Sequence, residues 1–423
     1  MCPVVPINKK NLSLRKIEKN SMSLFHYLSF LFIQHFLFVK CDAQPAPLDI
    51  PPPPPELVPG LYIFGDSYVD VGLNSKLDTL MTATYSPYGI DFAIGATGRF
   101  TNGGTIMDYL DRDLGLPTTV CYMSEEFLNN QVTTGFNYAS GSAGILHKTG
   151  RSLGDNWSMW KQIAMFNKTV RENLPSNFKG TAELSEYLSK CLFIVHIGSS
   201  DYTNNYLQTK HYNTSKIYNY NEFGSLLTMK LENQLKALYK LGARNIVVFE
   251  IGPLGCYPGS LKIFNPQTTC VDHINKMVSI FNTKLNRKVE ELRPTLEGAN
   301  IIIANVFKLI MDMIDKPSSY GFTDSRNPCC KVGRDALGLC IPNEDSCANA
   351  ETNLFWDDHH LTEATYKIIA EKCFKGSDLC TPKSIQEAIS SGQTHRPGFF
   401  HLLFVAITAG YFLFLENFRN PIV

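Results

Sequence analysis

The sequence predicts a doubly wound α/β sandwich, in which helices cover both faces of a mostly parallel sheet. Four short runs are rich in β-branched residues and apolar at nearly every position: 61–64, 192–198, 245–252 and 300–307. Strands of this composition are buried on both faces. Helix-like segments follow the second and third runs, and such alternation is typical of a parallel sheet covered by helices.

The two helix-like segments are recognised by the spacing of their apolar residues. In the first, leucines form one stripe at helical spacing and Gly242 follows as a C-cap. These leucines are Leu227, Leu231, Leu235, Leu238 and Leu241. In the second, residues 271–294 repeat the pattern and end at Pro294. The sequence contains no internal repeat, so we expect one domain over residues 61–385.

The segments on either side of this domain differ from it in composition. Residues 1–43 are interpreted as an extension and a signal peptide, because basic residues precede an apolar run at 24–39 and small residues follow it. A short membrane anchor is the alternative for this run. Residues 44–60 form a proline-rich leader, and residues 386–423 form a linker with a hydrophobic tail.

The hydrophobic tail affects the predicted cellular location of the protein. Residues 398–415 carry no formal charge at neutral pH, and their length is at the lower limit for a membrane-spanning helix. A lipid-anchor signal and a gene-model artefact are the other interpretations. We predict a secreted, extracellular protein, with attachment to a membrane through residues 398–415 as the alternative.

Composition limits the partners and the compartment. Lys+Arg and Asp+Glu are both 39, so the formal net charge is zero and no nucleic-acid partner is expected. Of the 12 cysteines, Cys2 and Cys41 lie in the predicted extension and signal peptide, and the remaining even number suits a disulfide framework. Zinc-site spacing is absent, and we expect no metal. The predicted N-glycosylation sites are Asn156, Asn167 and Asn213.

Polar residues follow the carboxyl ends of the predicted strands, where open α/β sheets hold their functional groups. Ser67 follows the first run, residues 198–205 follow the second, and a late segment contains Asp357 and His360. A carboxylate one helical turn from an imidazole can accept its Nδ1 proton and stabilise the imidazolium. A serine hydroxyl needs such a base. Ser67 is a candidate nucleophile if folding brings it to His360.

Six blocks in a fixed order carry a family resemblance. They are FGDSYVDVG (64–72), PYGIDF with ATGRFTNGGTIMDYL (87–110), GFNYASGSAGIL (135–146), IGSSDYTNNYL (197–207), GPLGCYP (252–258) and FWDDHHLTEA (355–364). Together they resemble the plant-type GDSL esterase/lipases, a branch of the SGNH serine hydrolases. The similarity extends from about Ile63 to Cys380. It implies a three-layer α/β/α sandwich with a flavodoxin-like, mostly parallel sheet.

The resemblance also implies roles for individual residues. Ser67 corresponds to the nucleophile and supplies one oxyanion-hole amide, His360 corresponds to the general base and Asp357 to the acid that orients it. A glycine of the third block supplies a further oxyanion-hole amide. Gly141 is the favoured position, and Gly135 and Gly144 remain open.

Several neighbouring residues are assigned other roles. His359 is two residues from Asp357 rather than three, so the family register selects His360, and Asp358 is likewise a neighbour. Asp66 is expected to make local turn hydrogen bonds, and His196 to be a buried core histidine.

The chain departs from the family pattern at two positions. Ser200 occupies the place where the family usually has an asparagine that donates to the oxyanion, and Leu361 the place of a proline. The loss of an oxyanion donor typically costs about 10²–10³ in turnover. We therefore include Ser200 in the predicted oxyanion hole as a substitute donor.

The predicted function is a serine esterase of the secretory pathway that hydrolyses lipid or carbohydrate esters through an acyl-enzyme. No cofactor is expected, and the partner is a small-molecule or polymeric ester. Acyl transfer is one alternative. A catalytically weak or silent protein that binds esters or glycans is another, because Ser200 replaces the asparagine.

Overall fold

The computed structural model describes residues 55–124, 133–333, 337–376 and 378–393. They all belong to one unit. The predicted signal peptide, most of the proline-rich leader and the tail at 398–415 lie outside the described residues. Among the described helices, none is both long enough and apolar enough to cross a membrane.

The central sheet has the strand order β1-β2-β3-β4-β7. The bounds are β1 Leu61–Gly65, β2 Leu192–His196, β3 Asn245–Phe249, β4 Asn300–Ala304 and β7 Cys380–Thr381. The first four strands are parallel, and β7 pairs antiparallel with β4. The predicted α/β class and the four predicted strands are confirmed.

One further segment runs along the outer side of β1. Thr134 O accepts from Leu61 N and Phe136 O from Ile63 N, and a parallel bridge joins Ile63 to Asn137. This segment occupies the position of the second strand in a flavodoxin-like order, in which the first strand lies inside the sheet. The flavodoxin-like arrangement therefore comes from a segment that the apolar pattern does not reveal.

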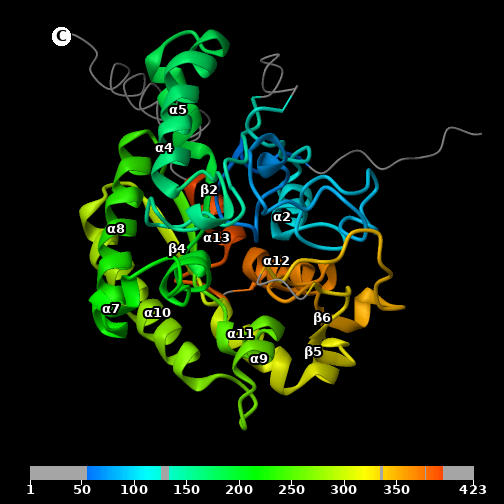
Figure 1. Cartoon of the computed structure of the whole chain (residues 1–423). Coiled ribbons are helices and arrows are strands. Elements are labelled where there is room, and N and C mark those ends of the chain that lie inside the picture. Colours follow the sequence, from blue (N-terminus) through cyan, green and yellow to red (C-terminus); the bar gives the residue numbers. More distant parts are fainter. Residues whose placement is uncertain (1–54, 125–132, 334–336, 377, 394–423) are drawn as a thin grey trace, which may run out of the picture. The chain divides into compact units, whose positions relative to one another are not determined.

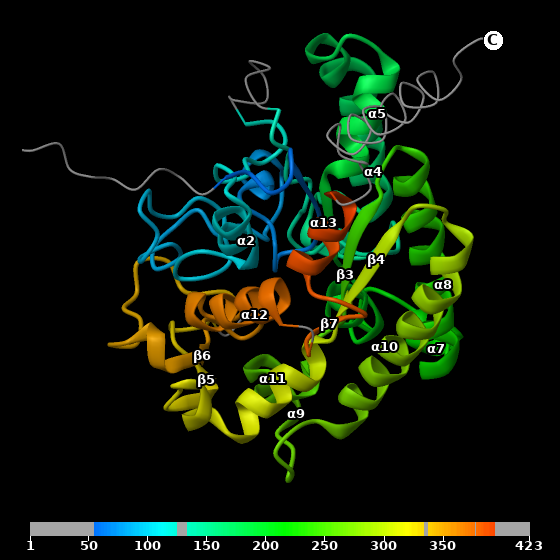
Figure 2. The same cartoon turned by 180° about the vertical axis from the view of Figure 1, so that it is seen from behind.

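Helices cover both faces of the sheet (Figures 1 and 2). On one face lie α4 (Met159–Lys168), α8 (Tyr220–Lys240) and α10 (Asp272–Leu292), and on the other α2 (Ile106–Leu114), α12 (Glu363–Lys375) and α13 (Ile385–Gln393). The remaining described α-helices and strands are α5 (Thr181–Lys190), α6 (Ser199–Asp201), α7 (Thr214–Ile217), α9 (Pro258–Phe264), α11 (Val306–Asp315), β5 (Asp324–Pro328) and β6 (Asn353–Phe355). The three-layer arrangement is as expected.

Helix α8 shows how the sequence sets the helix ends. Asn219 accepts from the amides of the first turn while Glu222 reaches back to the Asn219 amide, which makes a capping box. The leucine stripe faces inward, and Leu231 and Leu235 are each 1% exposed. The helix stops before Gly242, whose φ of +112° favours glycine.

Four disulfides confirm the expected framework for eight of the ten remaining cysteines, whereas Cys121 and Cys191 form no disulfide within the described residues. The disulfides join Cys256 to Cys270, Cys329 to Cys347, Cys330 to Cys340, and Cys373 to Cys380. The second and third close the loop beside β5 and β6 around a small second core that contains Trp356, Phe100 and Tyr88. The cysteines that crowd this loop are thus cross-links.

Candidate active site

The nucleophile candidate lies in a tight turn after β1. Gly65 has no room for a side chain, because a Cβ would lie 2.4 Å from His196 O and from Val69 Cγ2. Gln162 Nε2 donates to Gly65 O at 2.7 Å, and Gly65 N donates to Gln162 Oε1 at 2.9 Å. The turn is therefore fixed against β2 and α4, and Ser67 follows it directly.

The structure brings Ser67, His360 and Asp357 together. Ser67 Oγ lies 2.8 Å from His360 Nε2. His360 Nδ1 lies 2.9 and 2.8 Å from Asp357 Oδ1 and Oδ2. These contacts join positions 293 residues apart in the chain. Ser67 is 7% exposed, whereas His360 and Asp357 are 1% and 0% exposed, so only the serine meets solvent.

The chain around Asp357 keeps its carboxylate ionised. Oδ1 accepts from the amides of His359 and His360, and Oδ2 accepts from the Tyr88 hydroxyl at 2.7 Å. Burial favours a higher pKa for Asp357, but the charge and hydrogen bond of His360 and the Tyr88 hydrogen bond outweigh it and leave the pKa below its ordinary value. An ionised Asp357 can orient the imidazole and stabilise its protonated form.

His359 is directed away from this arrangement. A Cβ on Gly338 would lie 2.5 Å from His359 Nε2, and one on Gly259 would lie 2.7 Å from His359 Cε1, so the ring packs between these two backbones. Burial lowers the pKa of His359 to about 4. Neither nitrogen of this ring makes the contact with Ser67 that His360 makes.

The amide of Gly141 is already occupied, which corrects the prediction for this residue. It donates to Asp70 Oδ2 at 2.9 Å, while Asp70 Oδ1 accepts from the amides of Gly72 and Leu73 at 2.8 Å each. An amide bound to a carboxylate cannot also donate to a substrate oxyanion. Gly135 is excluded by position, because it lies beside Leu61 at the opposite end of β1 from Ser67.

Other amides near the end of β1 are uncommitted. Among the described residues, those of Ser67, Ser142 and Gly144 donate to no acceptor. Ser142 has a φ of +62°, which is uncommon for serine. Gly144 packs against Thr149 and Asp201, where a Cβ would lie 2.5 and 2.6 Å from their side chains.

Ser200 lies at the start of α6, at the carboxyl end of β2. It is 3% exposed, and its Oγ receives a long contact from Asn204 Nδ2 at 3.4 Å. The next residue, Asp201, accepts from the amides of Ile145 and Leu146. The segments that contain Ser142 and Ser200 are thus tied together.

Asp66 and His196 are buried behind the serine, in the local roles expected for them. Tyr68 N donates to Asp66 Oδ1 at 3.2 Å, and His196 Nδ1 lies 3.9 Å from the same oxygen. Burial raises the pKa of Asp66 to about 8 and lowers the pKa of His196 to about 4. Both groups are therefore largely uncharged at neutral pH.

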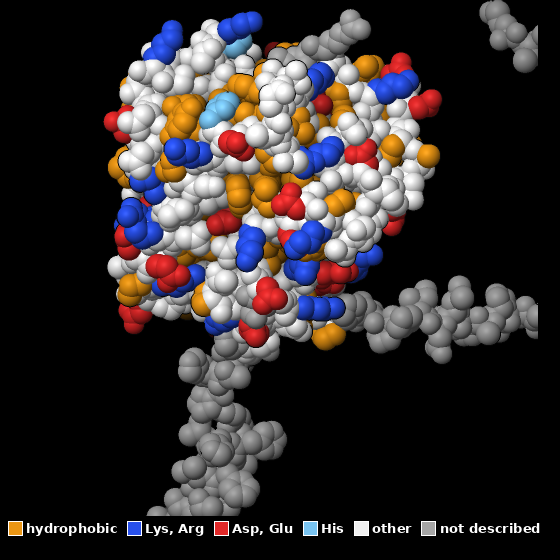
Figure 3. All heavy atoms as spheres, turned by 90° about the horizontal axis from the view of Figure 1, so that it is seen from below, with side chains coloured by type: hydrophobic (Ala, Val, Ile, Leu, Met, Phe, Trp, Pro, Cys, Tyr) orange, Lys and Arg blue, Asp and Glu red, His pale blue; other side chains and the backbone are white. Residues whose placement is uncertain are grey.

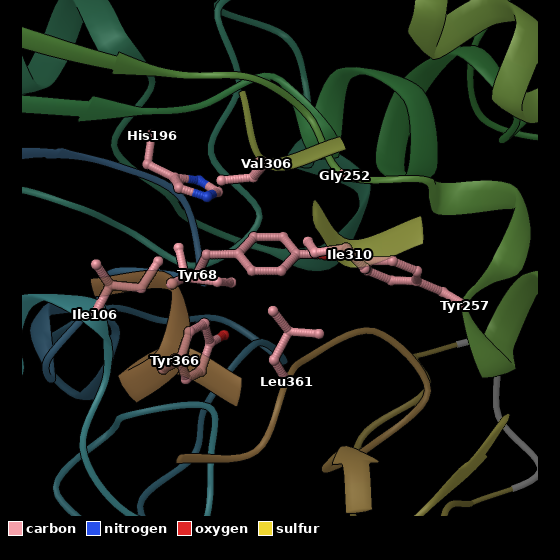
Figure 4. Close-up of a pocket in the computed structure, with 10 residues that line it drawn as sticks. Tyr68, Ile106, His196, Gly252, Tyr257, Val306, Ile310, Leu361 and Tyr366 are labelled. Carbon is pink, nitrogen blue, oxygen red and sulfur yellow. The ribbon is translucent and has the colours of Figure 1, made fainter. Parts of the chain in front are cut away.

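A small cavity lies beside this pair. In Figure 4 the Tyr68 ring extends across it, with His196 on one side and Leu361 and Tyr366 on the other. Its volume is about 10 Å³, close to the space that one water molecule needs. An acyl chain does not fit in this space.

The glycosylation predictions have different outcomes. Asn156 is 2% exposed, and its Nδ2, the atom that would carry a glycan, donates to Ser142 O, Ser142 Oγ and Thr149 O. The structure argues against Asn156, because a glycan on Nδ2 would displace these three contacts. Asn167 is partly exposed on α4 and Asn213 is exposed, so both stay predictions.

Sequence reasoning missed three residues at the site. Tyr88 donates to Asp357, Asp70 occupies the Gly141 amide, and the Phe100 ring lies 5.0 Å from the His360 ring. Tyr88 and Phe100 lie in the second block and Asp70 in the first, so the blocks mark their segments but not their contacts. Among the described residues, no group of three or more His, Cys, Asp or Glu side chains could hold a metal ion.

The fold and this Ser-His-Asp arrangement are those of a serine hydrolase with a doubly wound sheet. The family described as GDSL-like lipase/acylhydrolase matches residues 61–373, and the chain belongs to this family. GDSL esterase/lipase 7 of Arabidopsis thaliana is 42% identical over 335 residues, which cover 78% of this chain and 92% of that protein. A second Arabidopsis thaliana GDSL esterase/lipase is 37% identical over 338 residues, which cover 78% of this chain and 87% of that protein.

Proposed function

We propose that this hydrolase cleaves carboxylic esters with Ser67 as nucleophile, His360 as general base and Asp357 as the acid that orients it. The observation that carries the proposal is the continuous set of contacts from Ser67 Oγ to His360 Nε2 at 2.8 Å and from His360 Nδ1 to Asp357 Oδ2 at 2.8 Å. Geometry of this kind is the requirement for an activated serine.

The reaction follows from these positions. His360 Nε2 takes the proton of Ser67 Oγ as the oxygen attacks the ester carbonyl carbon, and then gives that proton to the leaving alcohol. Water, deprotonated by the same imidazole, attacks the acyl-enzyme and releases the acid together with free Ser67. The uncommitted amides of Ser67 and Ser142 are the donors that we assign to the oxyanion, in place of Gly141.

The compartment belongs to the same proposal. Four disulfides in the described residues support an oxidising environment, as in the secretory pathway. A secreted enzyme that carries glycans at Asn167 and Asn213 fits this environment. The sequence-based signal peptide at 24–39 supports the same route.

A serine-reactive fluorophosphonate tests the function. We expect the secreted protein to be labelled, and the Ser67→Ala variant to lose both labelling and turnover of p-nitrophenyl esters, by at least roughly 10⁴-fold. The second candidate is a silent binding protein, favoured by Ser200 at the position of the usual asparagine. Folded protein that is never labelled would support this candidate and refute the esterase.

A further inference from the structure

A groove lined by basic side chains lies at the molecular surface. Its volume is about 620 Å³, and four of its lining residues are cations: Lys148, Arg151, Lys210 and Lys216. No carboxylate is among its lining residues in the described chain. We call this surface the basic groove.

The charge of the basic groove is largely uncompensated. Lys148, Lys210 and Lys216 are exposed and form no ion pair with any described residue, and Arg151 alone has a partner, Asp155, at 3.0 Å. On the face in Figure 3, basic and acidic side chains are interspersed. A concentration of one sign of charge within a groove attracts ligands of the opposite sign.

The remaining lining favours a sugar over a lipid. It consists of hydroxyl, amide and imidazole groups and one aromatic ring, and it includes no aliphatic side chain. Tyr212 is held in place because its hydroxyl oxygen accepts from Ser152 N at 3.1 Å. Ammonium and guanidinium groups bind carboxylates, and hydroxyl groups exchange hydrogen bonds with sugar hydroxyls.

Hydrogen bonds connect the basic groove to the sheet edge that carries Ser67. Thr149, next to Lys148, donates to Asp201 Oδ1 at 2.6 Å, and Gly150 N donates to Asn204 O at 3.3 Å. Asp201 lies in α6 directly after β2, and β2 pairs in parallel with β1, which leads into Ser67. The walls of the groove are therefore built on the same edge as the nucleophile.

We infer that the basic groove binds an acidic polysaccharide, a chain of uronic acid sugars, whose ester groups are the substrate of Ser67. The substrate part of this inference rests on the proposed esterase function. Binding in the groove does not, because it involves only the carboxylates of the polymer and the cations of the groove.

The test is polygalacturonate binding by the full-length secreted protein with Ser67→Ala, measured by calorimetry. We expect binding that weakens as the salt concentration rises from about 0.02 to 0.5 M. The triple variant Lys148→Gln, Lys210→Gln, Lys216→Gln is expected to bind roughly tenfold more weakly or worse. The matched triple variant Lys276→Gln, Lys308→Gln, Lys367→Gln changes net charge equally at exposed positions outside the groove and is expected to bind normally.

Three comparisons make the result decisive. Fully methyl-esterified polygalacturonate, which is neutral, should bind more weakly, and polyglutamate, which is anionic without sugars, should also bind more weakly. Equal loss in both triple variants would overturn the inference, as would equal affinity for polyglutamate. Tighter, lysine-dependent binding to phosphatidylserine vesicles would assign the groove to a lipid surface instead.

The glycan site in the groove adds a further requirement. Asn213 lines the groove and is a predicted glycosylation site, so the secreted protein has to bind with its natural modification. We expect both this protein and the Asn213→Gln variant to bind. Binding by Asn213→Gln alone would overturn the inference. Fluorophosphonate labelling of the protein with Ser67 intact tests the esterase separately, so the two proposals can fail independently.

Discussion

Tyr88 links the triad to the disulfide-bonded loop. Its hydroxyl donates to Asp357 Oδ2 at 2.7 Å and accepts from Cys340 N at 3.1 Å, so one phenol joins the carboxylate of the proposed triad to a cross-linked backbone. The disulfide between Cys330 and Cys340 fixes that backbone in turn. Tyr88 is thus a positioning residue that acts through Asp357.

We predict that Tyr88→Phe lowers kcat about tenfold with little change in KM, because a hydrogen bond to a charged group is lost. The acidic limb of the kcat/KM profile should move to higher pH, since a carboxylate with one donor fewer stabilises a protonated imidazole more strongly. Tyr85→Phe is the control, because Tyr85 donates to Cys340 O but not to Asp357. Identical profiles for the two variants would contradict the role.

Ser200 leads to a prediction in the opposite direction. We expect Ser200→Asn to raise kcat roughly tenfold or more, because an amide reaches farther than a hydroxyl and restores an oxyanion donor. The measurement is steady-state turnover of p-nitrophenyl acetate, with the melting temperature as a check on folding. An unchanged or lower rate in a folded variant would refute this account of position 200.

The family blocks contain Ser67, Asp357 and His360, which the structure brings together, but no block indicates the partners of these residues. Tyr88 and Asp357 are 269 residues apart, and no local pattern reports such a contact. Gly141 shows a different limit. The block identifies the glycine, but it does not reveal the partner of the glycine's amide. In the structure Gly141 N donates to Asp70 Oδ2 at 2.9 Å.

Helix α8 is held by its buried stripe rather than by its exposed side. We predict that Leu235→Ala lowers the free energy of unfolding by about 2–5 kcal/mol, because it leaves a cavity in the core. Met229→Ala is the matched control in the same helix, since Met229 is 46% exposed and Leu235 only 1%. Urea unfolding measures both. Equal losses would mean that the stripe does not anchor the helix.

At the level of elements, continuous apolar runs reveal only strands buried on both faces. All four such runs are strands of the sheet. The segment beside β1 contains the polar residue Asn137, which interrupts any apolar run. Its side chain donates to Val69 O at 2.6 Å and accepts from Ala139 N at 2.8 Å. The two-residue β7 is too short to have a pattern. Both are defined by tertiary contacts.

Buried carboxyl groups make the stability of the whole molecule depend on pH. Burial raises the pKa of Asp66 from 3.8 to about 8, so the folded chain binds this proton more tightly than the unfolded chain does. The resulting stabilisation is complete below pH 3.8 and is lost as the pH rises through about 8. The loss is on the order of a few kcal/mol.

We predict that Asp66→Asn removes this loss, because the amide of Asn stays neutral. Its melting temperature should fall less between pH 5 and pH 8 than that of the natural protein, as measured by differential scanning calorimetry at roughly those two values. Asp345→Asn, at an exposed position, is the control and should follow the natural protein. A parallel decline in the Asp66→Asn variant would show that Asp66 does not carry the effect.

The segment beside β1 has a consequence for self-association. A long unpaired outer strand offers a row of backbone donors and acceptors to a second chain, and such strands promote aggregation. Here residues 134–140 cover the outer side of β1, and the opposite side of the described sheet ends in the two-residue β7. Among the described residues, neither margin of the sheet is therefore a long unpaired strand that would pair readily with a second copy.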